Sequence, residues 1–313
     1  MTGTRAVTQT QASTRPDLHF TIVIVGGGSA GIALAARLLR MRPTLDIAII
    51  DPATTHAYQP GWTLVGAGAM KLRDTLDQEG GLIPAGSKWL RAAVTSFQPE
   101  ANTVTLDDGR TVAYNRLIVC PGLQLDWDKI KGLRETLGRN GVCSNYSRET
   151  VEYTWTCIQS LAGGTALFTQ PPMPIKCAGA PQKIAYLASD YWRKKGTLSR
   201  TSVDFCLAGD VLFGVAYYRP ALQEAIDYYG INLRYKTNLI AVDGPARKAT
   251  FSVTAPDGTV TQEIRSFDML HVTPPQSAPD FIKQSPLADA AGWLDVHPAT
   301  LQHSRFESIF GAG

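Results

Sequence analysis

A cysteine flanked by lysines is the residue best suited to covalent chemistry in this sequence. Cys177 lies beside Lys176, just before a predicted helix, and Lys183 stands within reach of it. The positive end of the helix dipole and the two lysine side chains all favour a thiolate over a thiol. The pattern predicts a reactive thiol at Cys177. The alternative is a loop cysteine that only packs.

A glycine-rich turn predicts a second kind of chemistry, the binding of a dinucleotide. The apolar run 21–25 ends in Gly26-x-Gly28-x-x-Gly31, and Asp51 closes a second apolar run twenty residues later. Gly26 makes the tight turn, Gly28 lets a pyrophosphate approach the backbone, and Gly31 lets the helix pack on the strand. Helix N–H groups would hold the phosphates, and Asp51 would accept hydrogen bonds from a ribose. The alternative is a strand-to-helix turn without a ligand.

Both segments must be positioned by alternating strands and helices. In the first unit, the patterns predict a helix at 30–41 and strands at 21–26, 46–51 and 117–120. In the second unit, they predict helices at 149–161, 184–194 and 220–229 and strands at 165–169, 203–208 and 232–235. Strand–helix–strand repeats of this kind are typical of parallel sheets. The predicted fold class is therefore α/β, with two doubly wound Rossmann-like domains.

We predict three parts in the chain. Residues 1–19 form a polar, disordered tail. Residues 20–125 and 270–313 form a discontinuous dinucleotide-binding domain, and residues 126–269 form a second domain that carries the cysteine loop. The length of 313 residues agrees with two domains of about 150 residues each.

Composition argues against several classes of function. The chain is 44% hydrophobic and 18% charged, which suits a large core, and its net charge of +3 is too small to indicate nucleic-acid binding. The five cysteines form no Cys-x-x-Cys pair and no Cys/His cluster, which argues against a structural metal and against a disulfide scaffold. We see no secretory signal and no transmembrane segment in the sequence.

The other four cysteines have simpler interpretations. Cys206 lies in an apolar strand and Cys120 ends a buried strand, so core packing is predicted for both. A role for Cys120 stays open, because it lies close to the expected cofactor. Cys143 and Cys157 flank a helix start and show no partner pattern.

The second strand-to-helix turn differs from the first. A nicotinamide-binding domain would place another Gly-x-Gly-x-x-Gly after Thr169 to cradle phosphates. The chain instead has the bulky run Pro171-Pro-Met-Pro174, followed by Cys177. A thiol therefore stands where the phosphates of a second nucleotide would lie.

Five segments carry a resemblance to a known family. They are Gly26-Gly-Gly-Ser-Ala-Gly31, Tyr58-Gln-Pro-Gly-Trp-Thr-Leu-Val-Gly-Ala-Gly68, Lys176-Cys-Ala-Gly-Ala-Pro-Gln-Lys183, Leu270-His-Val-Thr-Pro-Pro275 and Leu287-Ala-Asp-Ala-Ala-Gly-Trp293. On these segments the chain resembles the sulfide:quinone oxidoreductases, flavoproteins with two dinucleotide-binding folds. It looks most like the branch that includes the mitochondrial enzymes.

The resemblance implies FAD at the glycine turn. The further residues that it places on FAD are Ser29 and Ala30 on the pyrophosphate, Asp51 on the adenosine ribose, Val94 on the adenine, Gln59 on the flavin and Gly122 near the ribityl chain. Cys177 matches one of the two redox cysteines of the family.

The resemblance also implies an activity. Sulfide attacks a sulfur bridged between two cysteines, and two electrons pass through FAD to a membrane quinone. Glutathione, sulfite or sulfide then removes the sulfane sulfur. The implied location is peripheral, on a bacterial plasma membrane or a mitochondrial inner membrane. The oligomeric state stays open, with a homo-oligomer among the options.

Two departures from the family pattern bear on this interpretation. Some relatives carry a cysteine where this chain has Tyr146, which supports the two-cysteine branch. The chain ends at Gly313, before the acid, the second redox cysteine and the membrane-docking helices that the family carries further on. We therefore expect a fragment that alone is inactive or binds flavin weakly.

Three alternatives remain at this point. A type II NADH:quinone oxidoreductase shares the fold but requires a phosphate-binding glycine turn in the second unit. A flavocytochrome-type sulfide dehydrogenase requires a haem subunit and export. A non-catalytic FAD-binding module would use Cys177 as a redox switch.

Overall fold

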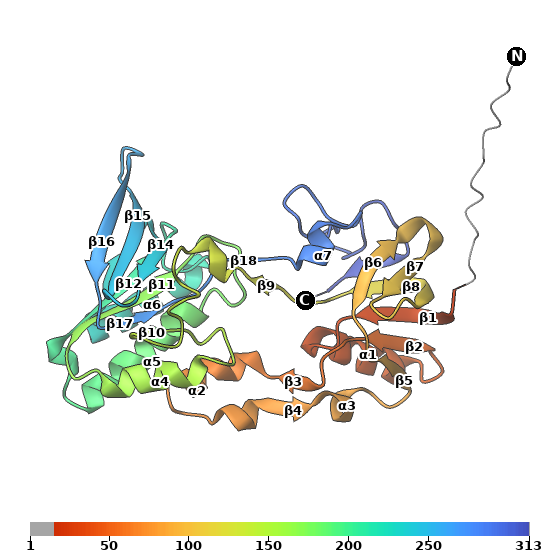
Figure 1. The fold of residues 1–313 in the computed structure, drawn as a ribbon, viewed down its shortest axis with the longest axis horizontal. Coiled ribbons are helices and arrows are strands. Elements are labelled where there is room, and N and C mark those ends of the chain that lie inside the picture. Colours follow the sequence, from red (N-terminus) through yellow and green to blue (C-terminus); the bar gives the residue numbers. More distant parts are fainter. Residues whose placement is uncertain (1–15, 313) are drawn as a thin grey trace, which may run out of the picture. The chain divides into compact units, whose positions relative to one another are not determined.

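The computed structural model describes residues 16–312 (Figure 1). Most of the tail predicted over 1–19 lies outside the described residues. Its predicted end needs correction, because strand β1 (Leu18–Val25) begins at Leu18. Leu18 is in register with Val112 of strand β8 (Thr111–Val119), so residues 18 and 19 belong to the first sheet.

The chain divides into two compact units. One contains the residues up to Thr54, Glu79–Gly122 and the residues from Asp280 onward; the other contains Thr55–Gln78 and Leu123–Pro279. Residues 55–78 therefore belong to the second unit, and the chain returns to the first unit at 280 rather than at the predicted 270.

Packing explains why residues 55–78 join the second unit. In these residues, β3 (Thr55–Ala57) pairs antiparallel with β4 (Leu76–Gln78), and the segment that connects the two strands contains helix α2 (Trp62–Gly66). Trp62 and Val65 of this helix pack against Val151 of helix α4 (Val151–Ser160) in one apolar cluster. Burial of such aromatic and branched side chains outweighs proximity along the chain.

The first unit is built on one sheet. Its strand order is β5-β2-β1-β8-β7-β6, with β19 also paired to β8. The bounds not yet given are β2 (Ile47–Ile50), β5 (Ser87–Leu90), β6 (Val94–Gln98), β7 (Thr103–Leu106) and β19 (Ile309–Gly311). Ile24 and Ile49, which are registered partners in β1 and β2, are fully buried. Such continuous apolar strands are typical of parallel sheets covered on both faces.

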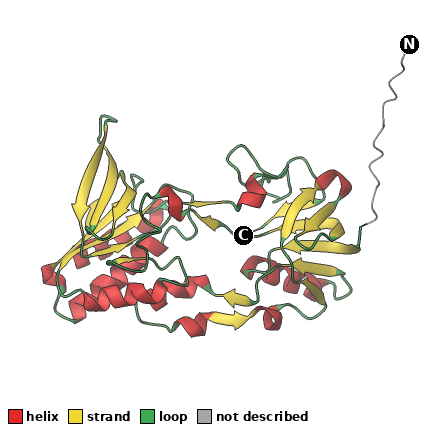
Figure 2. Ribbon diagram, viewed as in Figure 1, coloured by secondary structure: helices red, strands yellow, loops and turns green. Residues whose placement is uncertain are grey.

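The second unit has a fully parallel five-stranded sheet in the order β10-β17-β11-β12-β13. These strands are β10 (Val142–Cys143), β17 (Met269–His271), β11 (Gly164–Gln170), β12 (Thr201–Leu207) and β13 (Asn232–Arg234). Helices α4, α5 (Ala180–Lys194) and α6 (Arg219–Tyr229) are drawn red in Figure 2. The first sheet is mixed, because β6, β7 and β8 pair antiparallel, but its other strands are parallel. The parallel strands of both sheets, with their helices, confirm the predicted α/β class.

The two faces of the second sheet pack against different partners. Phe168 belongs to a core cluster with Trp192 of α5, whereas its neighbour Leu167 packs with Phe251. Phe251 lies in a three-stranded antiparallel sheet of β14 (Thr237–Asp243), β15 (Lys248–Thr254) and β16 (Val260–Ser266). One face is therefore covered by helices and the other by a second sheet, which the sequence analysis did not predict.

Short elements complete the described chain. They are α3 (Glu79–Leu82), α7 (Asp280–Lys283), β9 (Gln124–Leu125), β18 (Gln276–Ser277), and the 3₁₀ turns η1 (Gln59–Gly61), η2 (Leu72–Thr75), η3 (Pro99–Ala101), η4 (Trp127–Lys129), η5 (Leu198–Arg200) and η6 (Ala216–Tyr218). Strand β9 pairs with β18, so the two ends of the segment Leu123–Pro279 of the second unit lie side by side.

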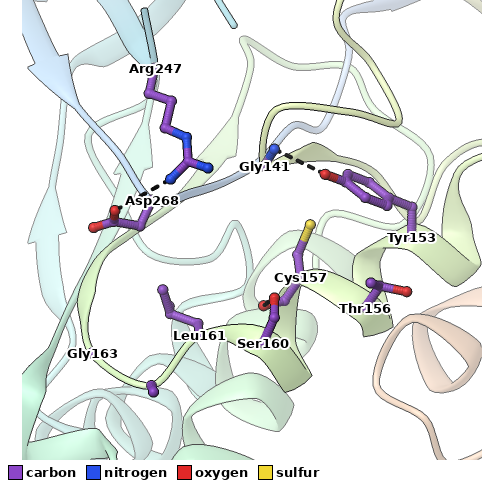
Figure 3. Close-up of a pocket in the computed structure, with 10 residues that line it drawn as sticks. Gly141, Tyr153, Thr156, Cys157, Ser160, Leu161, Gly163, Arg247 and Asp268 are labelled. Carbon is purple, nitrogen blue, oxygen red and sulfur yellow. Dashed lines mark hydrogen bonds and ion pairs between the residues drawn. The ribbon is translucent and has the colours of Figure 1, made fainter. Parts of the chain in front are cut away.

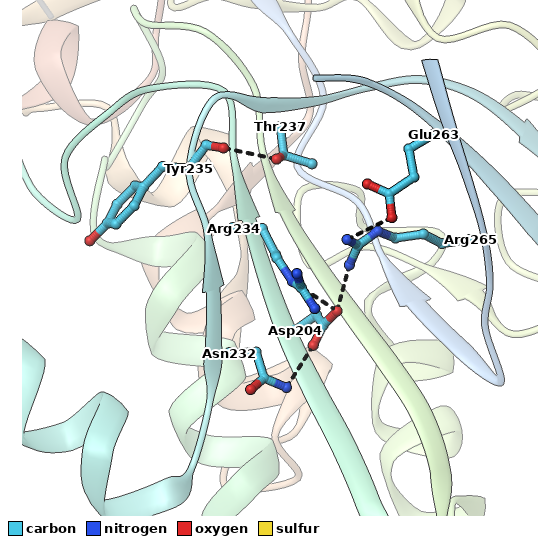
Figure 4. Close-up of polar contacts among 7 residues, drawn as sticks. All are labelled: Asp204, Asn232, Arg234, Tyr235, Thr237, Glu263 and Arg265. Atoms are coloured by element: carbon cyan, nitrogen blue, oxygen red, sulfur yellow. Dashed lines mark hydrogen bonds and ion pairs between the residues drawn. The ribbon is translucent and has the colours of Figure 1, made fainter. Parts of the chain in front are cut away.

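A polar network ties the antiparallel sheet to the parallel one (Figure 4). Asp204 of β12, only 6% exposed, accepts a 2.6 Å hydrogen bond from Arg265 of β16 and one of 2.8 Å from Asn232 of β13. Glu263 also contacts Arg265, at 2.9 Å. A buried carboxylate is tolerated here because it is paired and hydrogen-bonded.

Removing the buried carboxylate should destabilise the second unit. We expect Asp204→Ala to lower the free energy of unfolding by about 3 kcal/mol, because the Arg265 side chain, 14% exposed, loses its main partner. Asp190→Ala is the matched control: Asp190 pairs with Arg193 and Lys194 on the surface of α5, and we expect a loss of about 0.5 kcal/mol. Urea unfolding followed by circular dichroism measures both, and equal losses would contradict the assignment.

Candidate functional site

The glycine turn between β1 and α1 (Ser29–Met41) has the three features that its spacing predicts. Gly26 has φ +107°, and a Cβ there would lie 2.3 Å from the carbonyl oxygen of Cys120. A Cβ on Gly31 would lie 1.9 Å from the carbonyl oxygen of Gly26, so helix and strand are in backbone contact. A Cβ on Gly28 would meet nothing within 4 Å, which leaves open space on the ligand side of the turn.

The start of α1 offers free hydrogen-bond donors. Gly28 is its N-cap and supplies no side-chain hydrogen bond, and the first turn, which includes Ser29 and Ala30, contains no acid. Uncapped N–H groups and the positive end of the helix dipole together favour an anion. The open space at Gly28 and these donors fit a pyrophosphate.

Asp51 lies at this turn as predicted, immediately after β2. One carboxylate oxygen accepts a 2.5 Å hydrogen bond from Gly27 N–H, and the other accepts one of 2.7 Å from Ala53 N–H. The carboxylate therefore holds the turn in shape. It keeps further lone pairs for a ribose hydroxyl, and that contact stays a prediction.

Glu79 is a residue of this turn that sequence analysis missed. Its side chain is 2% exposed, and its Oε1 would lie 2.9 Å from a Cβ on Gly27. The hydrogen bond from Glu79 N–H to the Thr54 carbonyl, at 3.1 Å, brings α3 to this position. Glu79 follows an irregular stretch with no periodicity, so no signal in the sequence connects it to Gly27.

Two other predicted cofactor residues lie in the same unit. Val94 begins β6 four residues after Leu90, and Leu90 is the registered partner of Ile50 at the end of β2. Gly122 has φ +75° and open space around its Cβ position. Open space is therefore present at Gly122, and the contacts assigned to both positions stay predictions.

Cys120 packs in the core. Its thiol donates to the Gly26 carbonyl over 3.6 Å and is 4% exposed. Burial raises the pKa of the Cys120 thiol to about 12. The same holds for Cys206, where burial also raises the pKa to about 12. Neither thiol is poised to ionise near neutral pH.

Cys177 is the one exposed cysteine among the five. It lies in the loop between β11 and α5, in a left-handed conformation with φ +57°. Its carbonyl accepts a 2.8 Å hydrogen bond from Ala180 N–H, which starts the helix. The Nζ of Lys183 lies 3.7 Å from the Cys177 sulfur. The predicted contact between Lys183 and Cys177 at the beginning of α5 is therefore present.

Lys176 anchors the loop from three sides. Its N–H donates to Gln276 at 2.6 Å, its carbonyl accepts from the Tyr146 hydroxyl at 3.2 Å, and its Nζ donates to the Gln59 side chain. Burial lowers the pKa of the Lys176 ammonium. The expectation that both lysines serve the thiol thus needs refinement: Lys183 faces the sulfur, whereas Lys176 fixes the loop.

Gln59 and Tyr146 belong to this loop's surroundings. Gln59 was predicted on the flavin in the first domain, but it lies in the second unit, against Lys176. Burial, and secondarily the nearby Cys177, raises the pKa of the Tyr146 phenol, which therefore stays neutral. Tyr146 thus lies beside Cys177 as a neutral hydrogen-bond donor.

His271 supports Tyr146 from the core. Its imidazole is fully buried, and burial lowers its pKa to about 3, so it is neutral. The Nε2 atom accepts a 3.1 Å hydrogen bond from the N–H of Asn145, and the ring stacks on Phe168 at 5.8 Å. This histidine holds the segment before Tyr146 in place and does not reach solvent.

Comparisons with known proteins add the family. The model of the pyridine nucleotide-disulphide oxidoreductase family matches residues 20–152. The mitochondrial sulfide:quinone oxidoreductase of Mus musculus is 43% identical over 295 residues, which cover 94% of this chain and 65% of the relative. That of Schizosaccharomyces pombe is 35% identical and covers 94% of this chain and 68% of the relative.

The chain belongs to the sulfide:quinone oxidoreductase family. It spans about two thirds of the length of these relatives, 65% and 68%. The crystal structure of the sulfide:quinone oxidoreductase from the hyperthermophilic bacterium Aquifex aeolicus has the same fold, with a TM-score of 0.75 at 20% identity, over 95% of this chain and 68% of that one.

Sulfide:quinone oxidoreductases are FAD-dependent flavoproteins, so the family assigns FAD as the dinucleotide. The open space at Gly28 and the uncapped start of α1 fit its pyrophosphate. Within residues 16–312, no helix is long and apolar enough to cross a membrane.

The open space at Gly28 makes a sharp test. We expect Gly28→Val to fold normally, because its φ of −66° suits any residue, and to bind FAD at least about tenfold more weakly, because the branched side chain fills the pyrophosphate space. Gly31→Val should instead lose both the fold and the flavin, because its Cβ would overlap the Gly26 carbonyl.

Flavin absorbance per chain, together with thermal unfolding of the flavin-free proteins, separates the two effects. Unchanged flavin content in a folded Gly28→Val protein would contradict the assignment of the pyrophosphate to this turn.

Proposed function

We propose that this chain is the flavin- and cysteine-bearing part of an enzyme that oxidises sulfide to sulfane sulfur and passes two electrons through FAD to a membrane quinone. The observation that carries the proposal is Cys177, an exposed thiol 3.7 Å from Lys183, in the strand-to-helix loop where a second nucleotide site would otherwise lie. Membership in the family supports the choice of substrate.

The thiol chemistry needs a second sulfur. We propose that Cys177 shares a sulfur bridge with a cysteine in the part of the relatives' length that this chain does not span, since the other four cysteines are buried. Sulfide attacks one sulfur of the bridge, and the S–S bond breaks. One cysteine then carries the incoming sulfur as a persulfide, and the other is released as a thiolate. Bound FAD supplies a two-electron acceptor for this thiolate.

The residues of this chain prepare the thiol for that step. The Lys183 ammonium favours the thiolate by its charge. Cys177 lies just before α5, so the positive end of the helix dipole favours the thiolate as well. The hydrogen bonds of Lys176 to Gln276 and Tyr146 fix the backbone on which Cys177 stands. An anchored loop keeps the sulfur in one position between turnovers.

The individual FAD contacts are part of the proposal. We assign Gly26, Gly28 and Gly31 with Ser29 and Ala30 to the pyrophosphate, because they form the open turn and the start of α1. The others are Asp51 on the adenosine ribose, Val94 on the adenine, Gly122 near the ribityl chain and Gln59 on the flavin.

Partners and location follow the same reasoning. We propose that a small acceptor (glutathione, sulfite or sulfide) takes the sulfane sulfur from the persulfide. We also propose peripheral attachment to the membrane that holds the quinone. The mitochondrial names of the relatives favour the mitochondrial inner membrane over a bacterial plasma membrane.

An NADH-oxidising enzyme of the same fold is the main alternative. It needs a glycine turn that brings backbone N–H groups to the phosphates of NADH. In the second unit, the nine residues from Pro171 to Gly179 separate β11 from α5 and carry the exposed Cys177 instead. This loop is the reason that we favour sulfide as the electron donor.

Replacing the thiol tests the proposed function. In the full-length protein, we expect Cys177→Ser to reduce sulfide-dependent quinone reduction by at least about a thousandfold, because a hydroxyl cannot exchange sulfur, while FAD stays bound. Met173→Ala, an exposed residue of the same loop at 59% exposure, is the control and should keep its activity. Sulfide-dependent turnover that survives in Cys177→Ser would refute the role of this thiol.

Lys183 has a separate and smaller effect. We expect Lys183→Gln to slow alkylation of Cys177 by iodoacetamide about threefold at neutral pH. The ammonium group 3.7 Å from the sulfur stabilises negative charge on it, and glutamine removes this stabilisation. Lys195→Gln, at the other end of α5, is the matched control. Equal alkylation rates in all three proteins would show that Lys183 does not act on the sulfur.

A further inference from the structure

A pocket lies in the second unit, at the ends of its parallel strands that are opposite to Cys177. It has a volume of about 320 Å³ and is open to solvent. Its lining includes Gly163, just before β11, and Asp268, just before β17, whereas Cys177 follows the other end of β11. Figure 3 shows side chains of α4, together with Arg247 and Asp268, around it. The volume suits a small molecule.

Two cysteines meet at this pocket. Cys157 of α4 lines it and is 7% exposed, and Figure 3 shows its sulfur pointing away from the helix toward the loop of Gly141. Cys143 of β10 is fully buried behind it. Both cysteines belong to one core cluster, and a hydrogen bond links the two thiols.

Neighbouring groups treat the two thiols differently. The hydrogen bond from Cys143, then that from Tyr153 and the charge of Arg247, lower the pKa of Cys157 against its burial. Burial raises the pKa of Cys143. The Tyr153 oxygen accepts a 3.0 Å hydrogen bond from Gly141 N–H, which turns its own hydrogen toward the Cys157 sulfur. Cys157 is thus the more acidic thiol of the pair and Cys143 the less acidic one.

The charges at the pocket select the kind of molecule that reacts. Arg247 brings a guanidinium with five N–H donors to the lining, and Asp268 contacts it at 3.7 Å. The Asp268 carboxylate is fixed in position, because it also accepts a 2.9 Å hydrogen bond from Thr165 N–H. Thr156 and Ser160 add hydroxyl groups from α4. This lining suits a small, polar molecule with a carboxylate.

We propose that this pocket is a second thiol site, in which Cys157 reacts with the sulfur–sulfur bond of small, carboxylate-bearing disulfides and Cys143 resolves the product. The Cys157 thiolate attacks one sulfur of the disulfide and expels the other half as a thiolate, which leaves a mixed disulfide on Cys157. Cys143 then gives up its proton and attacks the Cys157 sulfur. A Cys143–Cys157 disulfide forms, and the second half of the small molecule leaves as a thiol.

The net reaction balances. Two cysteine thiols are oxidised to one disulfide, and one small disulfide is reduced to two thiols. No electrons pass to FAD or to a quinone, so the site does not rest on the proposed function. The pocket lies at the amino ends of the parallel strands, whereas Cys177 follows the carboxyl end of β11, so the two sites are separate.

Two nearly isosteric disulfides test the proposal on the purified chain. Dithiodiglycolate carries two carboxylates, and bis(2-hydroxyethyl) disulfide carries two hydroxyls. Peptide mapping by mass spectrometry follows each cysteine over time under native conditions. We expect Cys157 to react before Cys120 and Cys206, both buried with raised pKa values. A Cys143–Cys157 disulfide should follow, faster with dithiodiglycolate than with the neutral probe.

Variants separate the two steps. In Cys143→Ser the adduct on Cys157 should persist, because nothing resolves it. In Arg247→Gln the reaction with dithiodiglycolate should slow about threefold or more, and the neutral probe should be affected less. The proposal is overturned if Cys157 in the unaltered chain reacts no faster than Cys206, or if the adduct is equally short-lived in Cys143→Ser. The mapping of the unaltered chain decides the first point even if a variant fails to fold.

Discussion

The backbone contact between β1 and α1 is the constraint on which the first unit depends. Gly31 and the Gly26 carbonyl lie so close that a Cβ would stand 1.9 Å from the oxygen. This contact sets the direction of α1, and with it the place where free N–H groups meet an anion. Asp51 adds hydrogen bonds from the end of β2, so the turn is held by residues of two neighbouring strands.

The second unit uses the same strand-to-helix position for a different purpose. Between β11 and α5 the chain replaces a phosphate-binding turn with a loop that is anchored through Lys176 and presents Cys177 at its surface. At the start of this helix, where a phosphate would otherwise lie, the Cys177 sulfur contacts the ammonium group of Lys183. On the proposed function, a pair of related folds thereby supplies two chemistries, cofactor binding and sulfur exchange.

Local patterns predicted the parts of the site that depend on nearby residues. The glycine turn, α1, β2 and the Lys183–Cys177 pair all follow from short-range spacing, and the structure confirms them. Contacts between distant segments were missed. Glu79 reaches Gly27 through a buried turn, and Gln59 lies against Lys176, because residues 55–78 pack on α4 and not on the first sheet.

Another miss has an equally specific cause. Cys143 and Cys157 showed no motif, because a strand and the buried face of a helix bring them together across fourteen residues. Burial on a helix face can be read from periodicity, but the partner of a buried thiol cannot.

The central claim is that the flavin of this protein receives electrons from sulfide through a thiol and not from a nicotinamide. The most direct measurement is the anaerobic addition of each donor to the FAD-loaded, full-length protein, with flavin absorbance as the readout. The account predicts that sulfide bleaches the flavin and that NADH at the same concentration leaves it unchanged. Rapid bleaching by NADH, with no response to sulfide, would contradict it.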